Sequence, residues 1–418
     1  PGLAQPPAPA NTQEQAVVVL HATAHLGDGS VIQDAALAFD QGKITVITES
    51  NELTNLSAYK VIDGTGKHIY PGLILPNTDL GLTEVSAVRA TRDNRERGTL
   101  NPNVRSIIAY NADSELIPTL RYNGILVAQV ASGGGLVSGT SSVVQLDAWN
   151  WEDAALKTDD GIYLNWPRLF LPARWWMGEN EARNNPRYGE DVAQLEKLFS
   201  DAATYFNEGQ PAMINLKLEA MKGLFDGSKK LFIRTNRAKE ILESVQFAQK
   251  HGANNIVLVG ASDAWVVKDF IKKNSTPVIL NSLHRLPSRI EDDVDLPYKL
   301  PYLLHQEGIK VALGYLGTSN ARNLPFLAGT AAAYGLNKEQ ALSMVTSQTA
   351  SILGIDDRVG SLQEGLDATF VISEGDLLDM RSSRVEMAFI GGKQLELEGK
   401  QQRLFKKYKQ KYEDQAGQ

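Results

Sequence analysis

Residues 61–80 read VIDGTGKHIYPGLILPNTDL, and this stretch decides the fold expected for the chain. Its first apolar residues run into a Gly-Thr-Gly turn, and a short strand follows the turn. Pro71 and Gly72 interrupt that strand. Four apolar positions follow them and lead into Asn77, Thr78 and Asp79. Functional groups in α/β proteins stand where buried strands end, so residues 77–79 are the first candidates.

Both ends of the chain show short alternating strands separated by glycine-rich turns. Residues 16–72 contain a β-branched run, a Gly-Asp-Gly turn and two further alternating runs. Residues 359–398 begin VGSLQEGLDATFVISEGDLLDM and continue through VEMAFIGGKQLEL, with Gly391 and Gly392 at a hairpin. We therefore expect a small antiparallel β unit at each end.

The central part of the chain alternates short apolar runs with segments of helical periodicity, a pattern typical of βα units and a parallel sheet. The expected strands are residues 124–130, 231–233, 256–259, 277–280 and 310–313. The expected helices are residues 114–121, 237–251, 264–273, 298–307 and 338–353. The carboxyl ends of such strands meet at one end of the sheet, where we expect the site.

These residues resemble the amidohydrolase superfamily. In that family Pro-Gly-Leu-Ile-Asp-x-His-x-His ends the first barrel strand, and Pro71 to Ile74 match its first half. The family pattern Arg-x-Gly-Ser-Leu-x-x-Gly-x-x-Ala-Asp is matched from Arg358 to Ala368, with Thr369 where aspartate is usual. The chain is most similar to the imidazolonepropionase-like branch. The family activity that this implies is hydrolysis of non-peptide carbon–nitrogen bonds, often in cyclic amides.

The resemblance implies an α/β fold, a (β/α)8 TIM-like barrel plus a small β-sandwich built from both chain ends. We expect the barrel domain at residues 73–358 and a composite β-sandwich domain at residues 16–72 and 359–398. Residues 1–15 are expected to form a flexible leader, because they are rich in proline, alanine and glutamine. Residues 399–418 are expected to form a basic C-terminal helix or tail that packs on the protein, because its apolar face is short for a membrane binder.

The resemblance also implies positions for a metal site, with two histidines after strand 1, one each after strands 5 and 6, and an aspartate after strand 8. These positions hold Asn77, Asp79, Arg234, Gly260 and Leu316. A carboxylate can bind a hard cation and an amide can do so weakly, but a guanidinium has no free lone pair. We therefore expect no cofactor at the family site, and Zn only if a site is rebuilt from other ligands.

Asp79, Arg234 and His284 are the candidate catalytic residues. Asp79 and Arg234 are expected to face the barrel mouth, where an ion pair between them would plug the vacated metal site. Two alternatives stay open, in which Arg234 grips a carboxylate or phosphate ligand or Asp79 transfers protons. His284 is the only histidine near an expected strand end, and the alternative for it is an ordinary loop histidine.

Other polar and aromatic residues are candidates for binding. The candidate substrate-binding residues are Asn77, Asn236, Tyr315, Asn320 and Arg322. Residues 132–140, SGGGLVSGT, look superficially like a phosphate cradle but lack the Gly-Lys-Ser ending, so a glycine-rich loop is favoured. Residues 145–189 hold five tryptophans, which indicate either a lid or subunit interface or the core packing of an insertion.

Three functions are consistent with this pattern. The first is an amidohydrolase-fold protein with an eroded metal centre, a weakly active or noncatalytic companion of an active paralogue. The second is an active hydrolase with a non-standard or metal-free site around Asp79, Arg234, Asn236 and His284. The third is a small-anion-binding protein that uses the barrel mouth, with Arg234 as the anchor.

The composition bounds the expected partners. The chain has 49 acidic and 42 basic side chains and a formal charge of −7, which argues against a nucleic-acid or anionic-membrane surface. It has no membrane-spanning apolar run and no cysteine, which excludes disulfides and thiolate metal sites. We expect a small-molecule ligand or substrate, and a homo-oligomer or a complex with a paralogous amidohydrolase. Residues 1–15 fit the stump of a cleaved secretory signal, so we expect a periplasmic or secreted protein, with a cytoplasmic one as the alternative.

Overall fold

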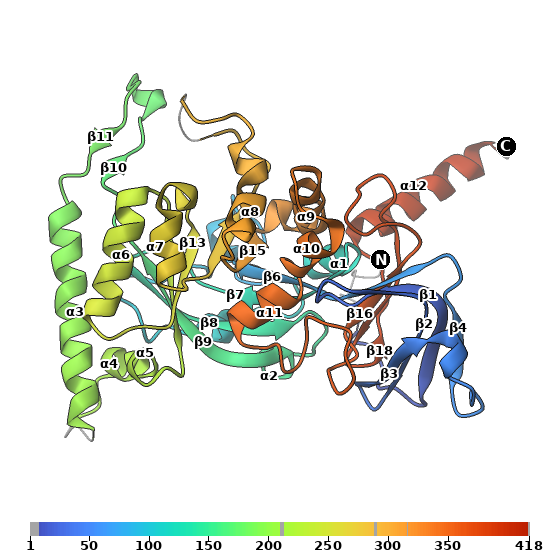
Figure 1. Cartoon of the computed structure of the whole chain (residues 1–418). Coiled ribbons are helices and arrows are strands. Elements are labelled where there is room, and N and C mark those ends of the chain that lie inside the picture. Colours follow the sequence, from blue (N-terminus) through green and yellow to red (C-terminus); the bar gives the residue numbers. More distant parts are fainter. Residues whose placement is uncertain (1–7, 210–212, 288–290, 316, 417–418) are drawn as a thin grey trace.

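The computed structural model describes residues 8–209, 213–287, 291–315 and 317–416. Figure 1 shows a central sheet covered by helices and, beside it, a second sheet that both ends of the chain build. The barrel and the composite β-sandwich predicted from the sequence are therefore confirmed.

The central sheet is an eight-stranded, nearly closed barrel. Its strands follow one another in chain order, and the last, β15, packs against the first, β6. The strands are β6 (Leu73–Thr78), β7 (Ile125–Val130), β8 (Val137–Gln145), β9 (Ala155–Asn165), β12 (Lys230–Thr235), β13 (Ile256–Gly260), β14 (Val278–Asn281) and β15 (Val311–Gly314).

One barrel strand runs against the others. β8 pairs antiparallel with both β7 and β9, whereas the remaining neighbours pair in parallel. A short loop, residues 131–136, joins β7 to β8 without a helix, and only α2 (Trp151–Ala154) lies between β8 and β9. The glycine-rich loop therefore lies at the same barrel end as the carboxyl ends of the parallel strands, which we call the mouth.

Helices cover the outside of the barrel in Figure 1. They are α1 (Ile117–Arg121), α3 (Tyr188–Glu208), α4 (Leu216–Met221), α5 (Gly223–Asp226), α6 (Ala238–Lys250), α7 (Lys268–Lys273), α8 (Leu296–Gln306), α9 (Leu324–Ala333), α10 (Lys338–Ser343) and α11 (Ser347–Leu353). The single helix predicted for residues 338–353 is thus two helices. Between them the carbonyls of Met344 and Val345 accept hydrogen bonds from Leu313 N at 3.1 Å and Ile74 N at 2.8 Å. The break in the helix therefore bridges the first and last barrel strands.

The second sheet closes on itself through its aromatic core. Phe39 lies on β2, yet its ring centre is 5.3 Å from that of Phe370 on β16 and 5.2 Å from that of Phe389 on β17. Three strands separate β2 from β17 along the sheet, so the sheet must curl to bring these rings together. Its strands are β1 (Val17–His25), β2 (Val31–Asp40), β3 (Lys43–Glu49), β4 (Lys60–Asp63), β5 (His68–Pro71), β16 (Phe370–Ser373), β17 (Val385–Ile390) and β18 (Lys393–Gln394).

Both terminal segments make contacts that the sequence did not specify. Within the predicted leader, residues 1–7 lie outside the described part, but Ala10 N donates to Asp147 Oδ2 at 3.0 Å and Gln13 Nε2 donates to the Phe39 carbonyl at 2.9 Å. The tail forms α12 (Lys400–Ala416), which extends away from the body in Figure 1. Its predicted packing on the protein is limited to its first turns.

The tryptophan-rich segment divides between core and surface. Trp166 is buried and its ring centre lies 5.3 Å from that of Phe247 on α6. Trp149 and Trp176 are exposed, the latter beside the small hairpin of β10 (Phe170–Leu171) and β11 (Arg183–Asn184). Among the described residues we find no helix with the length and apolar character needed to cross a membrane.

Candidate functional site

Arg234 occupies the mouth of the barrel at the end of β12. Its Nε and Nη2 donate to Asn77 Oδ1 at 3.1 and 2.8 Å, and Nη1 donates to the Ser132 carbonyl at 2.9 Å and to Asn165 Oδ1 at 3.4 Å. The guanidinium carbon lies 4.2 Å from the centre of the Tyr163 ring, in a cation–π contact. Three neutral acceptors and an aromatic face therefore hold this cation.

The backbone of β6 aims Asn77 at Arg234. The pairing of β6 with β7 shifts register between Leu75 and Thr78, and Asn77 adopts a φ of +52° in this bulge. Asparagine tolerates that left-handed conformation better than most residues. The fully buried Asn77 also donates from Nδ2 to Asn281 Oδ1 at 3.1 Å and from its backbone N to Gln129 Oε1 at 3.2 Å. The bulge and these bonds hold its amide in place.

A layer of buried polar side chains supports this pair from inside the barrel. Tyr163 OH donates to Gln129 Oε1 at 2.8 Å, and Gln129 Nε2 donates to Asp160 Oδ2 at 2.7 Å. Ser141 Oγ donates to the other oxygen of Asp160 at 2.7 Å. Burial raises the pKa of Asp160 to about 6, against the opposing effect of the two hydrogen bonds. Hydrogen bonds thus run from Asn77 through Gln129 to a buried carboxyl.

Burial also acts on the two members of the cation–π contact. It raises the pKa of the Tyr163 hydroxyl, and the nearby Arg234 charge opposes this change. It lowers the pKa of Arg234, while Tyr163 and Asp79 act in the opposite direction. A guanidinium stays protonated in proteins, so the mouth carries a fixed positive charge.

The ion pair predicted between Asp79 and Arg234 is wrong. Asp79 Oδ2 accepts from Asn94 Nδ2 at 3.0 Å, and its Oδ1 is buried without a hydrogen-bond partner. No ion pair within 4.0 Å joins Asp79 to Arg234 in the described part of the chain. The physical reason is that Asn77 takes up two donors of the guanidinium, whereas Asp79, which follows the last residue of β6, is held by Asn94.

A covering segment, residues 93–105, holds Asp79 and lies along the glycine-rich loop. Gly133 N donates to the Asn94 carbonyl at 2.7 Å, and Leu136 N donates to the Thr99 carbonyl at 2.7 Å. Gly135 has a φ of +64°, and a Cβ there would lie 2.8 Å from the Thr99 carbonyl oxygen. Glycine is thus needed for close packing of two backbones. The predicted glycine-rich loop, residues 132–140, is a loop only as far as residue 136, because β8 begins at Val137.

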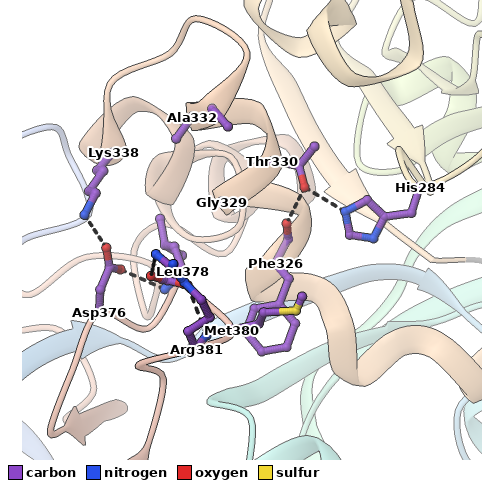
Figure 2. Close-up of a pocket in the computed structure, with 12 residues that line it drawn as sticks. His284, Phe326, Gly329, Thr330, Ala332, Lys338, Asp376, Leu378, Met380 and Arg381 are labelled. Atoms are coloured by element: carbon purple, nitrogen blue, oxygen red, sulfur yellow. Dashed lines mark hydrogen bonds and ion pairs between the residues drawn. The ribbon is translucent and has the colours of Figure 1, made fainter. Parts of the chain in front are cut away.

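His284 lies apart from Arg234, in the pocket shown in Figure 2. This pocket has a volume of about 330 Å³ and lies between α9 and residues 376–381. His284 Nε2 is 2.7 Å from Thr330 Oγ1, whose own proton is donated to the Phe326 carbonyl at 2.9 Å. The imidazole must therefore donate from Nε2, which leaves a lone pair on Nδ1. Burial lowers the pKa of His284, which favours this neutral form.

The other predicted site residues are spread around the mouth. Asn236 is exposed and accepts from Ser262 Oγ at 3.1 Å. Tyr315 is buried, which raises the pKa of its hydroxyl, while Asn320 and Arg322 are exposed on the 3-10 turn Thr318–Asn323. Gly260 ends β13 with no side chain to offer. Leu316 lies outside the described residues.

Several residues of the cluster were missed by sequence reasoning, among them Asn165, Asn281, Gln129 and Asp160. Asn165 and Asn281 are the last residues of β9 and β14, so the signal that identified Asn77, a polar residue ending an apolar strand, also marks them. Gln129 and Asp160 lie within strands and face the interior, where sequence patterns predict apolar residues. Nothing local in the sequence distinguishes them.

The residues at the mouth do not fit the metal that the resemblance implies. The available groups are one carboxylate held by Asn94, several amides and a guanidinium, whereas Zn takes three or four His, Cys or carboxylate ligands. Within the part of the chain that the structure describes, no three His, Asp or Glu side chains are grouped so as to hold a metal ion. We therefore derive no step through a metal.

Comparison with known proteins gives one family match and several structural likenesses. Residues 237–395 match the model of the amidohydrolase family. An amidohydrolase from Thermotoga maritima MSB8 is similar in fold, with a TM-score of 0.81 and 21% identity over 91% of this chain and 99% of that chain. A Xaa-Pro dipeptidase with methionine bound in its active site has a TM-score of 0.58 and 14% identity over 91% of this chain and 100% of its own. No curated protein matched the chain.

Proposed function

We propose that the chain is a member of the amidohydrolase superfamily whose metal centre has been lost, and that it acts as a noncatalytic or weakly active companion of an active paralogue. The observation that supports this proposal is the Arg234 guanidinium bonded to Asn77, two residues that the resemblance aligns with family metal ligands.

Electrostatics support the loss of the metal. Nη2 of Arg234 is 2.8 Å from Asn77 Oδ1, so a divalent ion bound by that oxygen would lie close to the guanidinium. A +2 ion about 4 Å from a +1 group is repelled by roughly 8 kcal/mol at an effective dielectric constant of about 20. Asp79 supplies one carboxylate near this oxygen, whereas divalent ions take several oxygen ligands.

The same geometry weighs against the other two functions. Of the five N–H groups of Arg234, four donate to Asn77, Ser132 and Asn165, so one is left to grip an anion. A metal-free hydrolase built on Asp79, Arg234 and His284 would need them at one place, but His284 lines a different pocket and bonds to Thr330. Neither alternative has an observation of its own in its favour.

Metal analysis tests the loss of the site. The protein is purified without chelator and dialysed against buffer with added Zn, Mn or Fe. Its metal content is then measured by elemental mass spectrometry. We expect well below one metal ion per chain, and the same content in an Asp79→Asn variant. One retained ion per chain, lost in the Asp79→Asn variant, would overturn the proposal.

The companion role is tested separately. A tagged form of the chain is crosslinked in the cells that naturally produce it and is then purified. We expect a second amidohydrolase, with an intact His-x-His pair, to be crosslinked to it. Hydrolase activity should follow that second chain when the two are separated. If the isolated chain described here retains all of the activity, the noncatalytic role is wrong.

A further inference from the structure

Helix α12 stands away from the rest of the protein and exposes apolar side chains. Its first turns are held by an ion pair between Arg403 Nη2 and Glu115 Oε2 at 2.8 Å and by a hydrogen bond from Thr119 Oγ1 to Gln401 Oε1 at 3.1 Å. Among the described residues, no hydrogen bond or ion pair joins residues 407–416 to the body. Figure 1 shows this part of the helix projecting beyond both sheets.

The exposed apolar side chains share one face of the helix. Leu404, Phe405, Tyr408 and Tyr412 are 42%, 68%, 51% and 63% exposed. At about 100° per residue, these four positions fall within an arc of about 100° around the helix axis. Exposed apolar side chains grouped in this way indicate a surface that is covered on binding.

Lysines border this apolar face on both sides. By the same helical geometry Lys411 lies about 20° beyond Leu404 on one edge, and Lys409 about 40° beyond Phe405 on the other. Lys411 Nζ is also 5.8 Å from the centre of the Tyr412 ring. Of the two acidic residues of the helix, Glu413 lies beyond Lys409, with its Oε1 3.6 Å from Lys409 Nζ, and Asp414 lies beyond Lys411. Long lysine chains at the edges of an aromatic face can keep their charges in a lipid headgroup layer while the rings are buried.

The charge of α12 is opposite to that of the whole chain. Residues 400–416 carry six basic and two acidic side chains, whereas the chain has a formal charge of −7. The net negative charge of the chain, which argues against binding to an anionic surface, is therefore the sum of an acidic body and a basic helix. An anionic surface would attract the helix and repel the body, which matches the outward projection of α12.

We propose that α12 is a membrane-surface anchor that lies in the headgroup region of a bilayer containing anionic lipid, with Phe405, Tyr408 and Tyr412 buried and Lys409 and Lys411 at the phosphates. Each lysine near an anionic surface and each buried ring contributes to this binding, so it is reversible and depends on salt. The inference does not depend on the state of the barrel mouth.

Vesicle co-sedimentation of the full chain tests the proposal. Vesicles are made of phosphatidylcholine alone or with about one third phosphatidylglycerol, at low and high salt. We expect binding to the anionic vesicles at low salt, much less at high salt, and little to neutral vesicles. Phe405→Ala with Tyr408→Ala, and separately Lys409→Glu with Lys411→Glu, should each lower the partition coefficient at least about tenfold.

A matched charge reversal elsewhere serves as the control. The double variant Lys217→Glu, Lys239→Glu makes the same change in net charge. The two residues lie in the first turns of α4 and α6, where a glutamate interacts favourably with the helix dipole. This variant should bind vesicles as the unaltered chain does. Equal loss in this control, or no binding of the unaltered chain to anionic vesicles, would overturn the proposal. A third outcome would also overturn it. If light scattering shows that the unaltered chain is an oligomer, that the Phe405→Ala, Tyr408→Ala variant is not, and neither binds vesicles, then α12 is a contact between copies of the chain.

Discussion

Asn77 Oδ1 accepts two hydrogen bonds from the guanidinium of Arg234, at 3.1 Å from Nε and 2.8 Å from Nη2. The amide nitrogen of Asn77 donates in the opposite direction, to Asn281 Oδ1 at 3.1 Å. These two neighbours together settle the orientation of the amide, because a flipped amide would face the guanidinium with a donor. The cation is therefore held by a rigid neutral acceptor.

Arg234→Lys should lower the free energy of unfolding by about 1–3 kcal/mol. The lysine ammonium lacks the planar set of N–H groups with which the guanidinium donates to Asn77, Ser132 and Asn165 at once. Urea denaturation monitored by circular dichroism measures the change. Arg322→Lys makes the same substitution at an exposed position and should stay within about 0.5 kcal/mol of the unaltered protein. Equal midpoints for the two variants would mean that the bonds of Arg234 are not stabilising.

Gln129→Leu should destabilise the barrel by about 2–4 kcal/mol. The change removes one hydrogen-bond partner from each of three buried groups, which are the Tyr163 hydroxyl, the Asn77 backbone N–H and the Asp160 carboxyl. Gln246→Leu on the exposed side of α6 is the control and should change the free energy of unfolding little. If both variants unfold at the same urea concentration, the buried layer does not contribute as described.

His68 should make the protein less stable in mild acid. Burial lowers the pKa of His68 below 6.5, and the charge of His25, whose Nε2 is 3.0 Å from His68 Nδ1, acts in the same direction. The unfolded chain then binds more protons than the folded one. The free energy of unfolding therefore falls as the pH drops from about 7 through the folded pKa.

The effect is measured as the difference in the free energy of unfolding between about pH 7.5 and pH 5, up to about 1.4 kcal/mol for each unit of pKa change. His68→Asn should reduce this difference, because the substituted side chain does not titrate. The same pH dependence in both proteins would count against the lowered pKa of His68.

Gly135→Ala should loosen the covering segment. The added Cβ would lie 2.8 Å from the Thr99 carbonyl oxygen, which accepts two of the hydrogen bonds between residues 93–105 and residues 133–140, from Leu136 N and Val137 N. Gly66→Ala is a matched control, since Gly66 has a similar φ of +75° with no atom within 4 Å of the added carbon. Hydrogen exchange of residues 93–105 should rise in Gly135→Ala only. A similar rise in both variants would point to backbone strain rather than to the contact.

Part of the candidate site could be predicted from the sequence because its signals are local. A polar residue at the end of an apolar strand identified Asn77, and the resemblance to the family pattern identified Arg234; the structure brings the two into contact. The predicted ion pair failed because the outcome depends on the bulge at Asn77, where the register of β6 shifts and Asn77, rather than Asp79, bonds to Arg234. The reversed β8 was not predictable either, since residues 137–145 are apolar, serine-rich and buried on both faces, without an alternation that indicates direction.

The sequence by itself predicted βα units and a parallel sheet from its periodicity, and its resemblance to the amidohydrolase family predicted the barrel and the β-sandwich shared by the two chain ends. These predictions were possible because periodicity and short motifs are properties of short segments. Only the tertiary structure decided which side chains meet at the mouth and which face of α12 stays exposed. Those outcomes depend on the register of strands and on contacts between residues more than a hundred positions apart, such as Asn77 with Arg234, and no short segment encodes them.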